Sequence, residues 1–540
     1  MLSYRKLAMR VLGRPLHTGG NDSPRPASQR AAAFVLTAAM LITLAAPAFA
    51  GTWYIENGDI TVKASGTEGK NTVSQGNKKD VEDTNTIITN SDKATASSHT
   101  VTIDAGNDKV EVTLKDVNID TSSRNKAAVS VTGSGNTTIK LDGDNALKSD
   151  TYRSGIYGSG SLTISGGEND SLTAQGGSGA NGISSSGSLT ISGGTVTANG
   201  DDGGHGIYSR GGVTISGGST VTANGRSGTI SGGDGIRSDG GVTISGGTVN
   251  ATGGNGGTIS GGDGIRSGGG LTVSDGTVTA KGGNGDSKDG YGGDGIRSGG
   301  VVTISGNTVN AAGGYGGKVG GYGICSFDRV AISGGTVEAA GGNGSTGGGS
   351  GIYSSVIDLS GSLELTAKAG SPTGKALLQN GRELDLDTIN KDKLGPGAKV
   401  TVTDAKGDSK QVSIPRPVEP EKPVIPEESS SSSDGGSSAP SAPVSSIPGL
   451  TVTDKDGAVI SYTSTQSGNT LTVCVGRFTA SLRASLSTLR QLRAEGIETI
   501  TFQTILCSTT LSVDELLAMG GEDAEAVLTH RLTDSSLTVG

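Results

Sequence analysis

Three arginines recur in this sequence in the same local setting, and their side chains are well suited to binding anionic groups. Arg237, Arg266 and Arg297 each follow a Gly-Asp-Gly-Ile step, at intervals of 29 and 31 residues. A guanidinium group is planar and permanently charged, so it can hold a carboxylate through two parallel hydrogen bonds. Other repeats carry an aromatic ring, which can stack on a sugar ring, at the equivalent position: Tyr157, Tyr208 and Tyr353. These six residues predict a ligand-binding stripe suited to an extended acidic polysaccharide.

A second interpretation of the arginines stays open. Asp234, Asp263 and Asp294 stand three residues before them, and exposed pairs of this kind are common and weak. The aspartates would then neutralise a row that repeat duplication copied without any selection for binding. If the arginines do bind, replacing all three with alanine should remove salt-sensitive binding without lowering the melting temperature.

One short segment contains residue types that could hydrolyse a glycosidic bond. Residues 200–206 contain Asp201, Asp202 and His205, which resemble two elements of the polygalacturonases. In that family the elements lie on separate coils and converge on one groove. Here they share one loop, and the matching Arg-x-Lys element is absent, so the motif lacks its structural context. No catalytic residue is therefore predicted, and a pectinase-like enzyme remains the alternative.

Calcium binding is the other chemistry that the glycine-rich sequence brings to mind. The segments at 232–235, 261–264 and 292–295 read Gly-Gly-Asp-Gly, as in the nonapeptide calcium repeat. That motif needs a second aspartate two residues later, where this chain has Ile-Arg. We therefore predict no metal and no cofactor, with calcium as an alternative that the motif does not support.

These candidate residues are spaced by an internal repeat of about 28 residues. Each unit reads Gly-Ile-x-Ser, then Val-Thr-Ile-Ser-x-Gly, then Thr-Val-x-Ala, then a Gly-rich stretch of variable length. Apolar and polar residues alternate within each short run, as in a β-strand, and such strands become stable when they stack on the next repeat. Three strands per unit predict a mainly β protein, a right-handed parallel β-helix of roughly twelve coils with inward columns of isoleucine and valine. The Gly-rich stretches are expected to be loops.

Five segments follow from the composition along the chain. A basic stretch, the apolar run at 31–46 and Ala48-Phe49-Ala50 predict a signal peptide over 1–50. Residues 51–100 are expected to form an N-terminal cap and first strands, and 101–414 the β-helix. Prolines and serines predict a linker over 415–448. Leucines at helical spacing and a capping box at 512–515 predict a small α+β domain over 449–540.

The overall composition excludes several classes of protein. Only 32% of the 540 residues are hydrophobic and 95 are glycine, against about 45–50% apolar residues in ordinary globular domains. The net charge is −9, and an acidic chain with few basic clusters is unsuited to nucleic acid. No segment after the signal peptide is expected to cross a membrane. If any disulfide forms, Cys474 and Cys507 are the candidate pair, with free thiols as the equal alternative.

The segment from Glu111 to Gly167 resembles a known family. VEVTLKDVNIDTSS, AAVSVTGSGNTTIKLDGDNALKS and SGIYGSGSLTISGG resemble the carbohydrate-binding β-helix proteins of clostridia and related gut Firmicutes, which look like polysaccharide lyases without catalysis. The C-terminal segment looks like an unassigned module of large secreted bacterial proteins. The resemblance implies glycan binding outside the cell and assigns no specific residue.

The expected function is a secreted or surface-associated bacterial protein that binds a polysaccharide as an adhesin without catalysis. A polysaccharide lyase or glycoside hydrolase and a purely structural stalk are the alternatives. The chain closes without a sortase-type signal, so any retention at the surface is expected through the C-terminal domain. Neither the glycan nor the oligomeric state follows from the sequence.

Overall fold

The computed structural model describes residues 51–415 except position 68, and residues 447–539 except 448, 455–456, 461, 468, 476, 478, 505–507, 520–523 and 531–534. The described residues fall into two compact units, divided between Pro420 and Glu421. The predicted signal peptide and most of the predicted linker lie outside the described residues.

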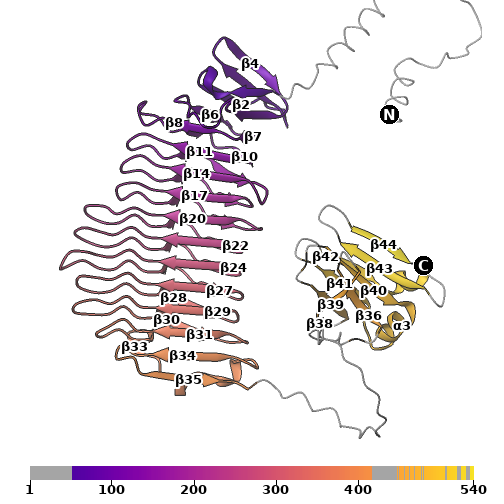
Figure 1. Cartoon of the computed structure of the whole chain (residues 1–540). Helices are drawn as coiled ribbons and strands as arrows, with labels where there is room; N and C mark the ends of the chain where they lie inside the picture. Colours follow the sequence, from indigo (N-terminus) through magenta and orange to yellow (C-terminus); the bar gives the residue numbers. More distant parts are fainter. Residues whose placement is uncertain are drawn as a thin grey trace, which may run out of the picture. The chain divides into compact units, whose positions relative to one another are not determined.

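The first unit is a β-solenoid of about 14 turns, and the whole structure has 51% strand and 6% helix. The parallel β-helix predicted from the repeat is therefore confirmed, with somewhat more turns than the predicted twelve. Figure 1 shows the coils stacked one on another. Their strands form three columns of parallel pairing, which we call ladders 1, 2 and 3.

Ladder 1 begins each regular coil at the Gly-Ile step and contains twelve strands. They are β2 (Ile60–Ala64), β6 (Val101–Asp104), β9 (Val129–Thr132), β12 (Ile156–Gly158), β15 (Ile183–Ser185), β18 (Ile207–Ser209), β21 (Ile236–Ser238), β23 (Ile265–Ser267), β25 (Ile296–Ser298), the first parts of β28 (Ile324–Ile332) and β30 (Ile352–Leu359), and β32 (Leu377–Gln379).

Ladders 2 and 3 complete each coil. Ladder 2 contains β1 (Thr52–Tyr54), β5 (Thr86–Thr89), β7 (Lys109–Lys115), β10 (Asn136–Asp142), β13 (Ser161–Ser165), β16 (Leu189–Ile191), β19 (Val213–Ile215), the first parts of β22 (Val242–Thr252) and β24 (Leu271–Lys281), β26 (Val302–Ile304), and the second parts of β28 and β30. Ladder 3 contains β8 (Asn118–Asp120), β11 (Asp144–Lys148), β14 (Ser171–Gln175), β17 (Thr195–Asn199), β20 (Thr220–Asn224), the second parts of β22 and β24, β27 (Thr308–Ala312), β29 (Thr336–Ala340), β31 (Glu364–Lys368) and β34 (Lys399–Thr403).

The core of the solenoid consists of the predicted inward columns. The isoleucine of every Gly-Ile step, from Ile156 to Ile352, is fully buried. The second and third columns, which begin at Ile164 and Leu172, are buried as well. Each such side chain contributes roughly 2 kcal/mol of transfer free energy on burial. Like residues therefore stack on like residues through the rod, which fixes the register of every outward position.

Antiparallel strands and short 3₁₀ helices lie at both ends of the parallel ladders. At the N-terminal end β2 pairs with β3 (Asn71–Gln75), which pairs with β4 (Lys78–Asp83), and η1 spans Ile55–Asn57. At the C-terminal end β32 pairs with β33 (Arg382–Glu383) and β34 with β35 (Ser409–Ser413), with η2 at Leu386–Thr388 and η3 at Lys391–Lys393. These pairings occupy ladder edges that would otherwise offer free main-chain groups.

The Gly-rich segments that join ladder 3 to ladder 1 lie outside the named strands, as predicted, and they also stack on one another. Segments 225–235, 253–264, 282–295, 313–323 and 341–351 stack beside the ladders and form what we call the glycine fin (Figure 1). Parallel bridges join successive segments at Gly228, Gly256, Gly285, Gly316 and Gly344. Main-chain pairing therefore continues well outside the three predicted strands.

A zigzag of main-chain hydrogen bonds runs through the base of the glycine fin. The Gly254 N–H donates to the Gly233 carbonyl, and the Gly262 N–H donates to the Gly254 carbonyl, each at 2.8 Å. Similar bonds continue through Gly283, Gly293, Gly314, Gly321, Gly342, Gly349 and Gly370. A Cβ atom added to Gly262 would overlap the carbonyl oxygen of Gly233, so only glycine permits this approach. This pairing could not be predicted from the sequence, because hydrogen bonds between main-chain groups do not require a periodic pattern of apolar residues.

The C-terminal unit has the predicted α+β composition. One sheet has the order β37 (Val459–Ile460), β36 (Leu450–Thr453), β40 (Ala480–Ser485), β43 (Glu525–His530), β44 (Ser535–Val539). The other has the order β38 (Thr463–Ser467), β39 (Thr470–Cys474), β41 (Thr499–Gln503), β42 (Ser508–Ser512). Helix α3 (Leu486–Ala494) buries Leu486, Leu489 and Leu492, the leucines at helical spacing. Helix α4 (Val513–Met519) begins where the Ser512 hydroxyl accepts a hydrogen bond from the Glu515 N–H.

Two further sequence questions concern this unit and the membrane. Of the two alternatives, a disulfide or free thiols, the structure has Cys474 as a free thiol. Cys507 lies outside the described residues. Among the described residues, no helix has both the length and the apolar character needed to cross a membrane.

Candidate functional site

The six predicted binding residues all stand on ladder 1, one residue after each buried isoleucine. Register partners along this ladder are, in order, Tyr157, Ser184, Tyr208, Arg237, Arg266, Arg297, Cys325 and Tyr353. Neighbouring strands lie about 4.8 Å apart, so the three arginines form an unbroken row on consecutive coils. We call this outward column the Tyr-Arg face.

Large side chains on the Tyr-Arg face are accessible, but the small ones between them are not. Tyr157 is 44% exposed, and the arginine side chains are between 34% and 44% exposed. Cys325, which stands at the equivalent outward position of its coil, is buried, because Arg297 and Tyr353 flank it on the ladder. Ser184 is buried between two tyrosines for the same reason.

Each arginine of the face forms an ion pair with the aspartate three residues before it. The distances are 3.7 Å from Arg237 to Asp234, 3.6 Å from Arg266 to Asp263 and 3.1 Å from Arg297 to Asp294. The pairs assumed by the neutralising interpretation are therefore present. The carboxylates are buried, whereas the guanidinium groups keep a solvent-facing side.

The aspartates belong to a second column, two residues before each isoleucine. The Asp263 N–H donates to Asp234 Oδ1, and the Asp294 N–H to Asp263 Oδ1, each at 2.7 Å. His205 Nδ1 accepts the Asp234 N–H at 2.7 Å, and Asn181 Oδ1 accepts the His205 N–H at 2.9 Å. We call this series the buried polar column. Each side chain in it satisfies a main-chain donor of the next coil, which is why an acceptor recurs there.

Burial changes the ionisation of this column. Removal from water, followed by repulsion between neighbouring carboxylates, raises the pKa of Asp263 and of Asp294 to about 7. The same burial raises the pKa of Asp234 and lowers the pKa of His205 to about 4. Groups that act on the column are the three arginines of the face, Asp239, Cys325 and Tyr322. Burial therefore disfavours the ionised form of all three aspartates, which favours a net positive charge on the face.

The pKa values predict that the solenoid loses stability as the pH rises. In the folded state each of these aspartates has a pKa of about 7, above the ordinary value of 3.8. Its contribution to the free energy of unfolding is therefore fully present below pH 3.8 and is lost as the pH rises through 7. Asp263→Asn together with Asp294→Asn should raise the melting temperature at pH 8 by roughly 5 °C and flatten its pH dependence. Asparagine already occupies this column at position 181, so the amide can accept the same bond.

Thermal unfolding between pH 5 and 9, followed by circular dichroism, measures this effect. An exposed control, Asp202→Asn, should leave the slope unchanged, because Asp202 is exposed outside the column. A double variant with the wild-type slope would contradict the raised pKa values.

Two grooves lie along the Tyr-Arg face. One, of about 540 Å³, runs between the arginines and the glycine fin and is lined by His205, Asp263, Tyr291, Arg266, Arg297 and Tyr322 among others. The other, of about 580 Å³, lies nearer the N-terminal end and is lined by Tyr152, Tyr157, Ser130, Ser184, Asn125 and Asn181 among others. Both follow the same side of ladder 1, so an extended ligand could occupy them together.

The polygalacturonase-like residues do not converge on one groove. His205 lines the groove beside the arginines, whereas Asp201 and Asp202 line a different groove with Arg226 and Asn255. The sequence-based conclusion that these residues lack their catalytic context agrees with this separation.

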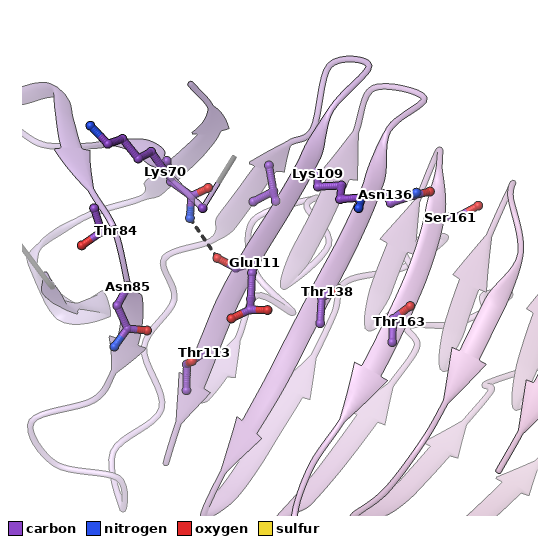
Figure 2. Close-up of a pocket in the computed structure, with 13 residues that line it drawn as sticks. Lys70, Thr84, Asn85, Lys109, Glu111, Thr113, Asn136, Thr138, Ser161 and Thr163 are labelled. Carbon is purple, nitrogen blue, oxygen red and sulfur yellow. Dashed lines mark hydrogen bonds between the residues drawn. The ribbon is translucent and has the colours of Figure 1, made fainter. Parts of the chain in front are cut away.

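A further groove lies at the N-terminal cap, away from the predicted residues. It has about 550 Å³, and Figure 2 shows Glu111, Thr138 and Thr163 side by side on β7, β10 and β13. The Asn71 amide donates to the Glu111 carbonyl at 2.8 Å, and Lys140 pairs with the Glu111 carboxylate at 2.6 Å. None of the described residues that line it is aromatic.

Two parts of the site were not predicted from the sequence. The buried polar column carried a readable signal, since the residue two before each isoleucine is polar from Asn181 to Tyr322. Tyr152 carried none, because it lies in the turn before ladder 1 and outside the repeat positions.

A parallel β-solenoid with a long polar face and accessible aromatic rings is a fold suited to extended ligands. Residues 82–347 match the model of a family described as carbohydrate-binding domain-containing protein. The matched segment includes the three arginines, Tyr157 and Tyr208, and ends before Tyr353. No curated protein and no solved structure matches the chain. The match supports carbohydrate binding as the general function.

Proposed function

We propose that the protein binds an extended acidic polysaccharide along the Tyr-Arg face without catalysing its cleavage. The observation that carries the proposal is the register: Tyr157, Tyr208 and the three arginines stand on one ladder and line or flank two grooves on the same side. The family match over the same residues supports a carbohydrate as the ligand.

Charge favours a polymer of acidic sugars. Three guanidinium groups on consecutive coils repeat at about 4.8 Å, and each presents hydrogen-bond donors to a carboxylate or sulfate. Because burial raises the pKa values of Asp263 and Asp294 to about 7, these aspartates compete only partly for the arginines at neutral pH. The carboxylates of a polyuronate remain exposed to solvent, so they can pair with the solvent-facing side of each arginine.

The proposed setting is extracellular. The N-terminal signal-peptide pattern and the resemblance to secreted bacterial proteins support secretion. Within that setting the solenoid would act as an adhesin, held near the cell surface through the C-terminal unit. Deleting residues 449–540 should then release the protein from cells.

A binding assay with the full chain tests the proposal. Polygalacturonate immobilised on a sensor should capture the protein at 20 mM salt, with affinity falling steeply as salt rises, because the contacts are between exposed charges. Affinity should also rise as the pH falls from 8 to 6, since protonation of the column aspartates leaves the arginines without competitors. Absence of binding to any polysaccharide at low salt would overturn the proposal.

Cleavage of the polysaccharide is the second candidate function, and one observation favours it. Carboxyl groups with a pKa of about 7 can act as general acids near neutral pH. However, Asp263 Oδ1 accepts the Asp294 N–H, and its Oδ2 lies 3.6 Å from Arg266, so both oxygens are already engaged. The formation of new reducing ends or unsaturated products from the bound polymer would establish an enzyme instead.

A further inference from the structure

The N-terminal groove of the Tyr-Arg face contains a feature that the repeat does not explain. Tyr152 is 79% exposed, more than any other large apolar side chain among the described residues, and its backbone has φ = 59°. Bulky residues seldom adopt this left-handed conformation, because it brings Cβ close to the carbonyl oxygen. Holding an exposed aromatic ring in a strained turn costs free energy of folding, and burial of the ring does not offset that cost.

Neighbouring coils hold this tyrosine in place. Its N–H donates to the Ser178 carbonyl of the next coil at 2.8 Å. A Cβ atom on Gly179 would lie 3.0 Å from the Tyr152 ring, so the ring lies against a position where glycine leaves room for it. The ring is therefore positioned at the edge of the groove.

The groove around Tyr152 combines rings with hydroxyl and amide groups. Tyr157 shares the lining, with Ser130, Ser184, Asn125 and Asn181. Its two cations are Lys126, which forms an ion pair with Asp59 at 3.0 Å, and Arg153, whose Nε donates to the neutral Asn125 Oδ1 at 3.4 Å. Aromatic faces with short polar side chains and no cation row match an uncharged sugar ring, whose C–H face stacks while its hydroxyls form hydrogen bonds.

We propose that Tyr152 and Tyr157 form a subsite for an uncharged pyranose ring, next to the arginine row. This proposal rests on the proposed polysaccharide binding and adds a second chemistry to the same face. Tyr157 and Arg237 are three ladder steps apart, about 14 Å, so one chain can contact both. The preferred ligand is then a heteropolysaccharide in which neutral and acidic sugars occur together.

Two substitutions test the subsite without threatening the fold. Tyr152→Asn removes the ring at a position where asparagine tolerates a positive φ, so the melting temperature should hold or rise. Tyr157→Ser introduces the residue that the neighbouring coils carry at the same ladder position, Ser130 and Ser184. The matched control is Tyr315→Asn, which removes a tyrosine that is 47% exposed on the glycine fin.

The probes are immobilised neutral hexasaccharides of glucose, mannose, galactose and xylose, presented to the full chain in 1 M salt. High salt screens exposed charges to a few ångströms and isolates the neutral subsite. We expect the wild type and Tyr315→Asn to bind at least one hexasaccharide, with affinity reduced at least tenfold in the other two variants. Equal affinity in all four proteins, or no hexasaccharide binding by the wild type, would overturn this inference. Polygalacturonate capture at low salt would still stand in that case, so the two proposals fail separately.

Discussion

Replacing Gly262 or Gly293 with alanine is expected to disrupt the centre of the solenoid. An added Cβ would overlap the carbonyl oxygen of the glycine one coil earlier, Gly233 or Gly262, and the backbone there is fixed by the zigzag of hydrogen bonds. Neither contact involves a flexible side chain that could move aside. Neighbouring fin segments would have to separate, with a loss of at least several kcal/mol of unfolding free energy, beyond the ~1–3 kcal/mol usual for overpacking. Thermal unfolding and limited proteolysis of the full chain measure this loss.

A surface glycine provides the control for these variants. Gly218 is exposed, and a Cβ atom there would meet nothing within 4 Å, so Gly218→Ala should leave the melting temperature within a degree or two. If Gly262→Ala were as stable as this control, the close stacking of the glycine fin would be wrong.

Removing the arginine row is expected to abolish capture by polygalacturonate at low salt, a loss of at least a hundredfold in affinity. Alanine at Arg237, Arg266 and Arg297 alone would be hard to interpret. Each change leaves a buried aspartate without its cation, which is strongly destabilising in general. The structure thus revises the sequence-based expectation that alanine leaves stability unchanged.

A paired design separates binding from stability. The triple variant with asparagine at Asp234, Asp263 and Asp294 keeps the arginines and removes their competitors, so it should bind polygalacturonate more tightly than the wild type and lose its pH dependence. Adding glutamine at the three arginines to that background should abolish capture while circular dichroism stays unchanged. Retained capture in the six-fold variant would show that the polysaccharide lies elsewhere.

The regular part of the fold could be predicted because its information is carried by side chains. Ile156 and its equivalents repeat in type and spacing, so their stacking, and with it the outward register from Tyr157 to Tyr353, follows from the sequence. The ion pair between Arg297 and Asp294, and its equivalents, could be predicted as the alternative to ligand binding, because each of these repeats has an aspartate three residues before the arginine.

The remaining features depend on groups that the pattern does not contain. The glycine fin is held by carbonyl and N–H groups, which are the same at every residue, so its order leaves no trace beyond abundant glycine. The backbone angle of Tyr152 depends on the turn between two coils, and a single residue outside the period gives no statistical signal. Asp263, whose pKa is raised by burial, lies in a segment of the glycine fin, and the sequence placed that segment in a loop.

The contacts between coils set a rule for how such a rod can change in length. Every coil in the arginine region pairs only with the coil before and the coil after it, and the antiparallel strands at both ends are untouched by what lies between. A duplicated unit of about 28 residues could therefore be inserted in register, extending the face by one strand spacing of about 4.8 Å. The length of polymer bound by the protein would then change by one coil for each repeat gained or lost, and recombination between repeats could make that change heritable.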